Sequence, residues 1–194
     1  MLRASAPLAA LLVAALLVWQ GSNAAFSATT DNTGDAWATG NLLLENNGGG
    51  TVYGGTTSAL FTESNLKPGN SGVKCITVQS TGSLAGNLRL YRGAITGTNS
   101  AALSAVLDVT IDAVAVPAST NVQANCTGYT GGSGGALYNG TLSAMPSTYA
   151  ASSGLAVAGG TQRVAYRIGW TLNASAGNTV QSSTAAANLM WEIN

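Results

Sequence analysis

The chain contains no histidine and has few charged residues. Lys and Arg together number 7, Asp and Glu together number 7, and charged residues make up 7% of the 194. Without histidine the chain lacks the usual general base at neutral pH and the commonest protein ligand for metals. Serine triads and HExxH zinc sites are therefore excluded.

The few charges are also scattered, and the formal net charge is +0. No cluster of Lys and Arg could neutralise a row of phosphates, which argues against nucleic-acid binding. Low charge removes most of the electrostatic repulsion that keeps proteins monomeric. The composition is therefore permissive for self-association.

Cysteine is nearly absent, with only Cys75 and Cys126 present. In an exported chain we expect these two to form a disulfide, with two separate buried thiols as the alternative. The bond would close a loop of about 50 residues and stabilise the fold by about 4 kcal/mol in the chain-entropy model. Two cysteines without histidine are too few ligands for a closed tetrahedral zinc site.

The chain begins with the pattern of a signal peptide, predicted to cover residues 1–24. Arg3 precedes an apolar run from residue 8 to residue 18, and small residues follow it. Cleavage between Ala24 and Ala25 would leave a mature chain of residues 25–194. The run is too short to span a bilayer and no second one follows, although a retained anchor is the alternative reading.

The remaining residues are mainly Gly, Ala, Ser, Thr and Asn, which favour short strands joined by turns. Residues 164–172 alternate most clearly, with Val164, Tyr166 and Ile168 on one face and Ala165 and Arg167 on the other. A helix over residues 100–107 competes with the start of a strand there. The other predicted strands are residues 38–45, 51–53, 73–79, 88–92, 106–116 and 188–194.

About eight short strands predict an all-β fold, a single two-sheet antiparallel sandwich of jelly-roll or immunoglobulin-like type over residues 25–194. The Gly-rich stretches 46–50 and 130–135 are predicted to be flexible loops with little to pack. Neither has the Lys and following helix of a phosphate-binding loop.

The acidic residues offer few candidates for chemistry. On one strand Asp108 and Asp112 would lie about 13 Å apart, beyond the roughly 5 to 9.5 Å of the two glycosidase geometries. We expect both to be solvated residues on the wet face of their strand.

Residues 31–35 form an Asx-type turn that could hold a weak calcium ion but lacks the pattern of an EF-hand loop. Sequons at Asn125, Asn139 and Asn173 matter only in a host that glycosylates.

Several ordered segments resemble the TasA and camelysin (CalY) family of secreted Gram-positive matrix proteins. The resemblance covers roughly the first ninety residues and the last strand at Met190-Trp191-Glu192, and nothing from residue 94 to residue 155. Two departures are Asn70, where the family has an acidic residue, and the paired cysteines. The matching segments are Ala24-Ala25-Phe26-Ser27, Ala38-Thr39-Gly40-Asn41-Leu42-Leu43-Leu44, the turn Leu66-Lys67-Pro68-Gly69-Asn70 after Asn65, Cys75-Ile76-Thr77-Val78, and Thr81-Gly82-Ser83-Leu84.

The resemblance implies a jelly-roll sandwich that a SipW-like signal peptidase processes and that is deposited in the extracellular matrix or at the cell surface. It also implies fibres in which each copy, with or without accessory matrix proteins, donates its N-terminal strand to the next, by β-augmentation. Phe26 and Trp37 are the expected anchors, with a core role for Trp37 equally open. The donated residues would be Ala25, Phe26, Ser27, Ala28, Thr29 and Thr30.

Two other functions are possible. Camelysins are described as metallopeptidases, but without histidine this chain would need a zinc site made of carboxylates alone, so we expect no enzyme and no cofactor. A passive adhesion or carbohydrate-binding module would share the fold, and Tyr129, Tyr138 and Tyr149 are candidate contacts for it.

Overall fold

The computed structural model describes residues 41–55 and 59–194. Its elements in chain order are β1 Leu44–Asn46, β2 Ser71–Ser80, β3 Gly86–Arg92, α2 Ser100–Ser104, β4 Leu107–Val116, β5 Tyr138–Thr141, the 3-10 turn η1 Leu142–Ala144, β6 Gly154–Val157, β7 Gln162–Leu172, the 3-10 turn η2 Asn178–Val180, and β8 Leu189–Ile193.

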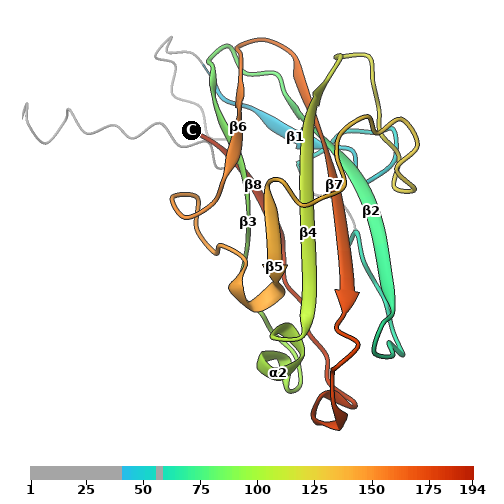
Figure 1. Cartoon of the computed structure of the whole chain (residues 1–194). Helices are drawn as coiled ribbons and strands as arrows, with labels where there is room; N and C mark the ends of the chain where they lie inside the picture. The colour runs from blue at the N-terminus through green and yellow to red at the C-terminus, as the bar shows by residue number, and fades with distance from the viewer. Residues whose placement is uncertain (1–40, 56–58) are drawn as a thin grey trace, which may run out of the picture.

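The strands form two packed antiparallel sheets, which confirms the predicted all-β sandwich (Figure 1). One sheet has five strands in the order β1-β2-β7-β4-β5, and the other has three in the order β6-β3-β8. All strand pairs in the described ranges are antiparallel.

The core lies between the two sheets, and β7 is its main contributor. Val164, Tyr166 and Ile168 point inward as predicted, and each is at most 2% exposed. Because β7 lies between β2 and β4, its inward side chains meet those of both neighbours and of the opposite sheet. The buried members of this cluster are Ile76, Val78, Leu88, Leu90, Val109, Ile111, Met145, Val157, Val164, Tyr166, Ile168 and Ile193.

A second, smaller cluster covers part of the outer face of the five-stranded sheet. Cys75, Val116, Val122 and Ala165 are its buried members. The segment between β4 and β5 covers this cluster, because its residues Val122, Cys126 and Tyr129 pack against strand residues there. The central strands are therefore apolar on both faces over part of their length, as strands buried on two sides are.

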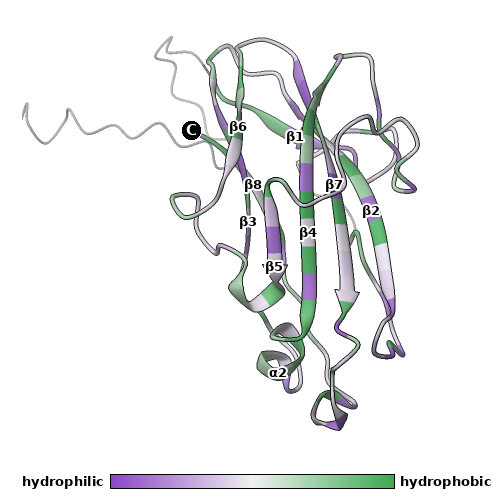
Figure 2. Ribbon diagram, in the orientation of Figure 1, coloured by the Kyte–Doolittle hydropathy of each residue, from purple (hydrophilic) through white to green (hydrophobic). Residues whose placement is uncertain are grey.

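β4 differs from its prediction. Its inward residues are apolar as expected, and hydrophilic positions interrupt hydrophobic ones along the strand (Figure 2). However, Asp112 on the outer side is only 2% exposed. The expectation that Asp112 is a solvated surface residue is wrong, because the loop that leads into β5 covers it.

Some of the remaining local predictions are confirmed and others are not. The helix forms over Ser100–Ser104 and yields to β4 at Leu107, and the last strand forms at Leu189–Ile193. Residues 51–53 form no strand, and of the predicted strand 38–45 only its end joins β1, while residues 38–40 lie outside the described ranges. The loop 46–50 has more to pack than expected, since Asn47 is 4% exposed.

Candidate functional site

Part of the predicted assembly machinery lies outside the described residues. This applies to the cleavage pair Ala24 and Ala25, the segment 25–30, Trp37 and the candidate calcium turn 31–35. The edge strands of both sheets, β1, β5, β6 and β8, lie within the described residues.

The pairing order of the strands is nested. β4 pairs with β5, β3 pairs with β6, and β2 pairs with β7, so each pair encloses the previous pair in the sequence. This is a jelly-roll-like order. The next pair outward would join β8 to a strand that precedes β2. β1 precedes β2 but pairs with β2 itself.

Consequently β8 has a strand partner on one side only within the described ranges. Its partner is β3, with Leu88 opposite Ile193 and Leu90 opposite Trp191. Asn87 and Asn194 exchange backbone hydrogen bonds, with donor–acceptor distances of 2.9 and 3.4 Å. Antiparallel ladders alternate hydrogen-bonded and non-hydrogen-bonded pairs.

That alternation determines which backbone groups of β8 face β3 and which face the opposite edge of the strand. Counting back from Asn194, the N–H and C=O groups of Glu192 and Met190 point to β3, whereas those of Ile193, Trp191 and Leu189 point to the opposite edge. None of the backbone hydrogen bonds in the described part of the chain reaches these groups at that edge. We call this row of three residues the β8 edge.

Trp191 of the β8 edge packs against Tyr166 of β7, and each of these side chains has a buried polar atom without a hydrogen-bond partner in the described chain. The Trp191 ring packs edge-on against Tyr166, with centroids 5.7 Å apart and an interplanar angle of 70°. Within the described chain, the buried Tyr166 hydroxyl and Trp191 indole nitrogen have no hydrogen-bond partner. Burial raises the pKa of the Tyr166 hydroxyl, so this group stays protonated.

The outward side of the same strand carries Glu192 and the exposed Met190. The Tyr91 hydroxyl donates a hydrogen bond of 2.7 Å to the Glu192 carboxylate across the β3–β8 pair. That bond raises the pKa of Tyr91 to about 12, with burial and the Glu192 charge acting in the same direction.

The turn Leu66-Lys67-Pro68-Gly69-Asn70 enters β2 from the opposite end of the sandwich to β1. Asn70 N–H donates to the Lys67 carbonyl at 2.9 Å, and Gly69 has a φ of 86°. Proline followed by a glycine with positive φ gives a type II turn. Asn70 Oδ1 also accepts from Lys67 N–H at 2.8 Å, and an acidic side chain at position 70 could accept the same bond.

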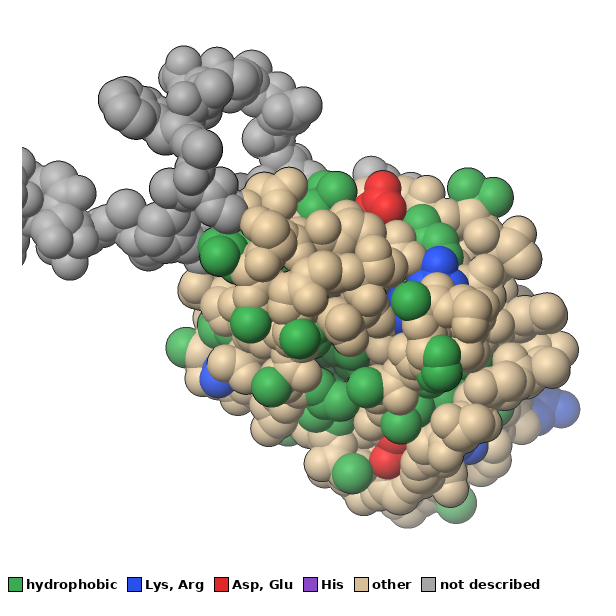
Figure 3. Space-filling view, turned by 90° about the horizontal axis from the view of Figure 1, so that it is seen from above, with side chains coloured by type: hydrophobic (Ala, Val, Ile, Leu, Met, Phe, Trp, Pro, Cys, Tyr) green, Lys and Arg blue, Asp and Glu red, His purple; other side chains and the backbone are tan. Residues whose placement is uncertain are grey.

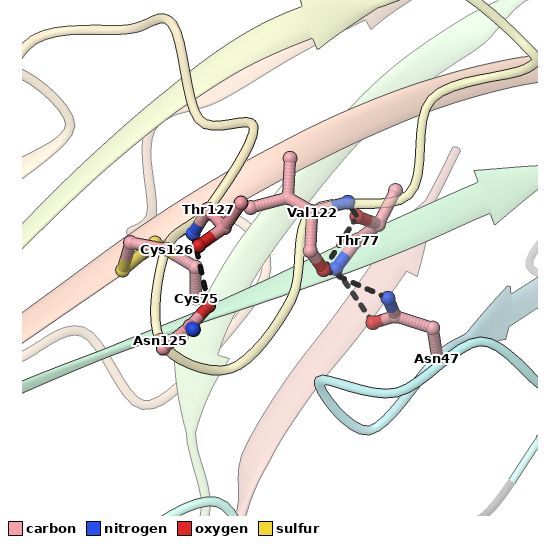
Figure 4. The surroundings of a disulfide bond; sticks show 7 residues. All are labelled: Asn47, Cys75, Thr77, Val122, Asn125, Cys126 and Thr127. Carbon is pink, nitrogen blue, oxygen red and sulfur yellow. Dashed lines mark hydrogen bonds between the residues drawn. A yellow bond between two sulfur atoms is a disulfide. The ribbon is translucent and has the colours of Figure 1, made fainter.

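The predicted disulfide joins Cys75 on β2 to Cys126 in the segment after β4, across a separation of 51 positions. Beside it, the buried Asn47 side chain links three parts of the chain (Figure 4). Its oxygen accepts from Thr77 N–H at 2.8 Å, and its nitrogen donates to the Val122 carbonyl at 3.0 Å. The Val122 N–H in turn donates to the Thr77 hydroxyl at 3.0 Å. The disulfide and Asn47 thus fix the segment after β4 to the outer face of the sheet.

The three tyrosines that were candidate carbohydrate contacts do not share a surface. Tyr129 packs in the small outer cluster, and burial, with the Asp112 charge, raises its pKa. Tyr138 donates from its hydroxyl to the Thr141 carbonyl at 2.6 Å. Tyr149 lies beneath the Arg89 guanidinium, 4.5 Å from its ring centroid, beside the three-stranded sheet.

The described ranges contain no group of three or more His, Cys, Asp or Glu side chains that could hold a metal ion. In the same ranges, no helix is long and apolar enough to cross a membrane. Seen from above, the surface consists mainly of uncharged polar side chains and backbone, with scattered hydrophobic and isolated charged side chains (Figure 3).

The fold is therefore a jelly-roll-like β-sandwich, and β8 is one of its four edge strands in the part of the chain that the structure describes. Comparison with models of known protein families finds no match, and comparison with curated proteins finds none either.

Proposed function

We propose that the chain is a secreted structural subunit that assembles into fibres in the extracellular matrix or at the cell surface, by pairing the N-terminal segment of one copy with the β8 edge of the next. The resemblance to TasA and camelysin matrix proteins suggests this function. The observation that carries it is the β8 edge, where Leu189, Trp191 and Ile193 present backbone groups without a strand partner in the described chain.

The length of the donated segment suits this edge. The six residues 25–30 in extended form cover about 20 Å, at about 3.3 Å per residue. β8 has five residues. Backbone hydrogen bonds would supply affinity, while alternate side chains of the segment, Phe26 first among them, would enter the space between the sheets.

A second copy can donate this segment without a reversal of the chain between residue 30 and Asn41. Asn41 is fixed to Ser83, because each backbone N–H donates to the other's side-chain oxygen, at 3.1 and 3.2 Å. This is the end of the sandwich at which β8 finishes, since Asn194 pairs with Asn87 nearby. A self-paired antiparallel strand would start at this end and finish at the far one. Residues 31–40 would then have to double back along the length of β8 to reach Asn41.

Deletion of residues 25–30 from the secreted protein tests the proposal. Wild-type protein should form filaments visible by electron microscopy, and the deletion variant should sediment as soluble monomer. A synthetic peptide of residues 25–30, added before assembly, should cap the β8 edge and shorten wild-type filaments, while a scrambled peptide should not. Filaments of normal length from the deletion variant would rule out this mode of assembly.

A further inference from the structure

The outer face of the five-stranded sheet contains a groove beside the segment that the disulfide holds down. Its volume is about 390 Å³. Six of its lining residues are Ser71, Thr110, Ser133, Arg167, Gly169 and Thr171. All but Ser133 come from the three central strands β2, β7 and β4, so the floor of the groove is rigid sheet.

Gly169 makes the floor hollow. It lies at the centre of the groove, opposite Val73 on β2 and Thr110 on β4. A Cβ atom at position 169 would lie 2.7 Å from the Thr110 hydroxyl oxygen, so any side chain would fill the space. The lack of a side chain therefore leaves the Thr110 hydroxyl open to the groove.

Arg167 supplies a positive charge that nothing nearby neutralises by direct contact. Asp112 is opposite Arg167 on β4, but its oxygens accept from Gly135 N–H at 2.8 Å and Ala136 N–H at 2.9 Å. In the described part of the chain, no hydrogen bond or ion pair to Arg167 is formed. Arg167 as a residue is only partly buried, and it lines the groove.

Arg163 provides a comparison on the same strand and the same face, four residues earlier. Its guanidinium donates to Gln79 at 2.7 Å, to the Thr120 carbonyl at 3.0 Å and to Asn121 at 3.1 Å. It also lies 4.6 Å from the centroid of the Tyr53 ring. Arg163 is therefore committed to holding the fold, whereas Arg167 retains free donors.

We propose that this groove binds an acidic saccharide, with the sugar carboxylate on Arg167 and sugar hydroxyls on the Ser and Thr side chains around it. A guanidinium group presents paired N–H donors that match a planar carboxylate. Hydroxyl groups at positions 71, 110, 133 and 171 can both donate and accept, as sugar hydroxyls require. The site has one cation, and Asp108 lies opposite Thr171 at the other end, so it suits a singly charged ring better than a polyanion.

Isothermal titration of the secreted protein with an oligosaccharide that carries a single galacturonic acid residue tests the proposal, with its methyl ester as the neutral probe. We expect the acid to bind and the ester to bind at least about tenfold more weakly. Arg167→Gln should weaken binding of the acid about tenfold, and Thr171→Val should weaken it by about threefold by removing one hydroxyl partner. Arg163→Gln, the matched control, should leave the affinity within about twofold of wild type.

Thermal unfolding of each variant separates loss of binding from loss of fold, and Arg167→Gln should melt close to wild type because it breaks no hydrogen bond or ion pair in the described chain. Three results would overturn the proposal: no binding by the wild type, equal affinity for acid and ester, or unchanged affinity in Arg167→Gln. Equal competition by inorganic sulfate and by the singly charged oligosaccharide would also overturn it, since the hydroxyl contacts would then contribute nothing. Filament formation should be unchanged in Arg167→Gln, so this test is independent of the assembly proposal.

Discussion

The Asp112 carboxylate on β4 accepts a hydrogen bond of 2.8 Å from the backbone N–H of Gly135, although 23 positions separate the two residues. Its other oxygen accepts from Ala136 N–H at 2.9 Å. A buried carboxylate thus ties down the Gly-rich loop before β5. This contact closes the outer face of the sheet beside the proposed saccharide groove.

Asp112→Ala should lower the free energy of unfolding by about 3 kcal/mol, because it leaves two backbone donors without their charged acceptor. Asp108→Ala is the matched control on the same strand and face. Asp108 accepts only a long bond of 3.4 Å from Asn173, so its removal should cost about 0.5 kcal/mol or less. Urea unfolding of both variants measures the difference, and equal losses would contradict the loop-tying role of Asp112.

Asn47→Asp should destabilise the fold by about 2–4 kcal/mol despite its equal size. The change places an oxygen where the amide nitrogen now donates to the carbonyls of Gly50 and Val122. Asn125→Asp is the control, because Asn125 uses only its oxygen, to accept from Thr127 N–H at 3.0 Å, and Asp can do the same. Similar unfolding midpoints for the two variants would show that Asn47 does not hold the segment after β4.

The Cys75→Ala/Cys126→Ala double variant should lose up to about 4 kcal/mol of stability, chiefly because the unfolded chain is no longer restrained across the 51 positions. Wild-type protein unfolded in the presence of reductant should match the double variant. A stability equal to that of oxidised wild type would mean that Asn47 and the outer cluster alone hold the segment.

Stability should fall between about pH 10 and pH 12 through the Tyr91–Glu192 pair. The pKa of Tyr91 is raised from 10.0 to about 12 in the folded protein, chiefly by its hydrogen bond to Glu192. In that interval the unfolded chain releases the Tyr91 proton and the folded chain keeps it, so the stabilising contribution is complete below pH 10 and lost as pH approaches 12. Tyr91→Phe should flatten this part of the profile, measured by urea unfolding at each pH. An unchanged slope would contradict the assignment.

The sequence predicted the parts of the fold that depend on alternation within one strand. Tyr166 and Ile168 were placed inward because they share a period-two face with other apolar residues, and they are 0% and 2% exposed. The burial of Asp112 could not be predicted, because it depends on a loop 23 residues away. The same limit applies to the β8 edge: the pattern of residues 188–194 identified a strand, but only the pairing order shows which neighbour it lacks. Arg167 and Arg163 are equivalent in the pattern, and their different partners emerge only from tertiary contacts.

The β8 edge gives the sharpest test of assembly, because a proline can block the edge without touching the pairing to β3. Leu189 lies opposite Arg92 in a non-hydrogen-bonded pair, so its N–H points away from β3. Leu189→Pro should therefore spare the β3 ladder, remove one donor at the edge and reduce filament yield strongly.

Ala156→Pro makes the matching change at the other edge of the same sheet, where β6 pairs with β3, and filament yield should stay near wild type. Sedimentation and electron microscopy, with circular dichroism to confirm folding, measure both variants. Equal filament yields from Leu189→Pro and wild type would exclude the β8 edge as the acceptor, whereas loss in both variants would mean that the whole three-stranded sheet is required.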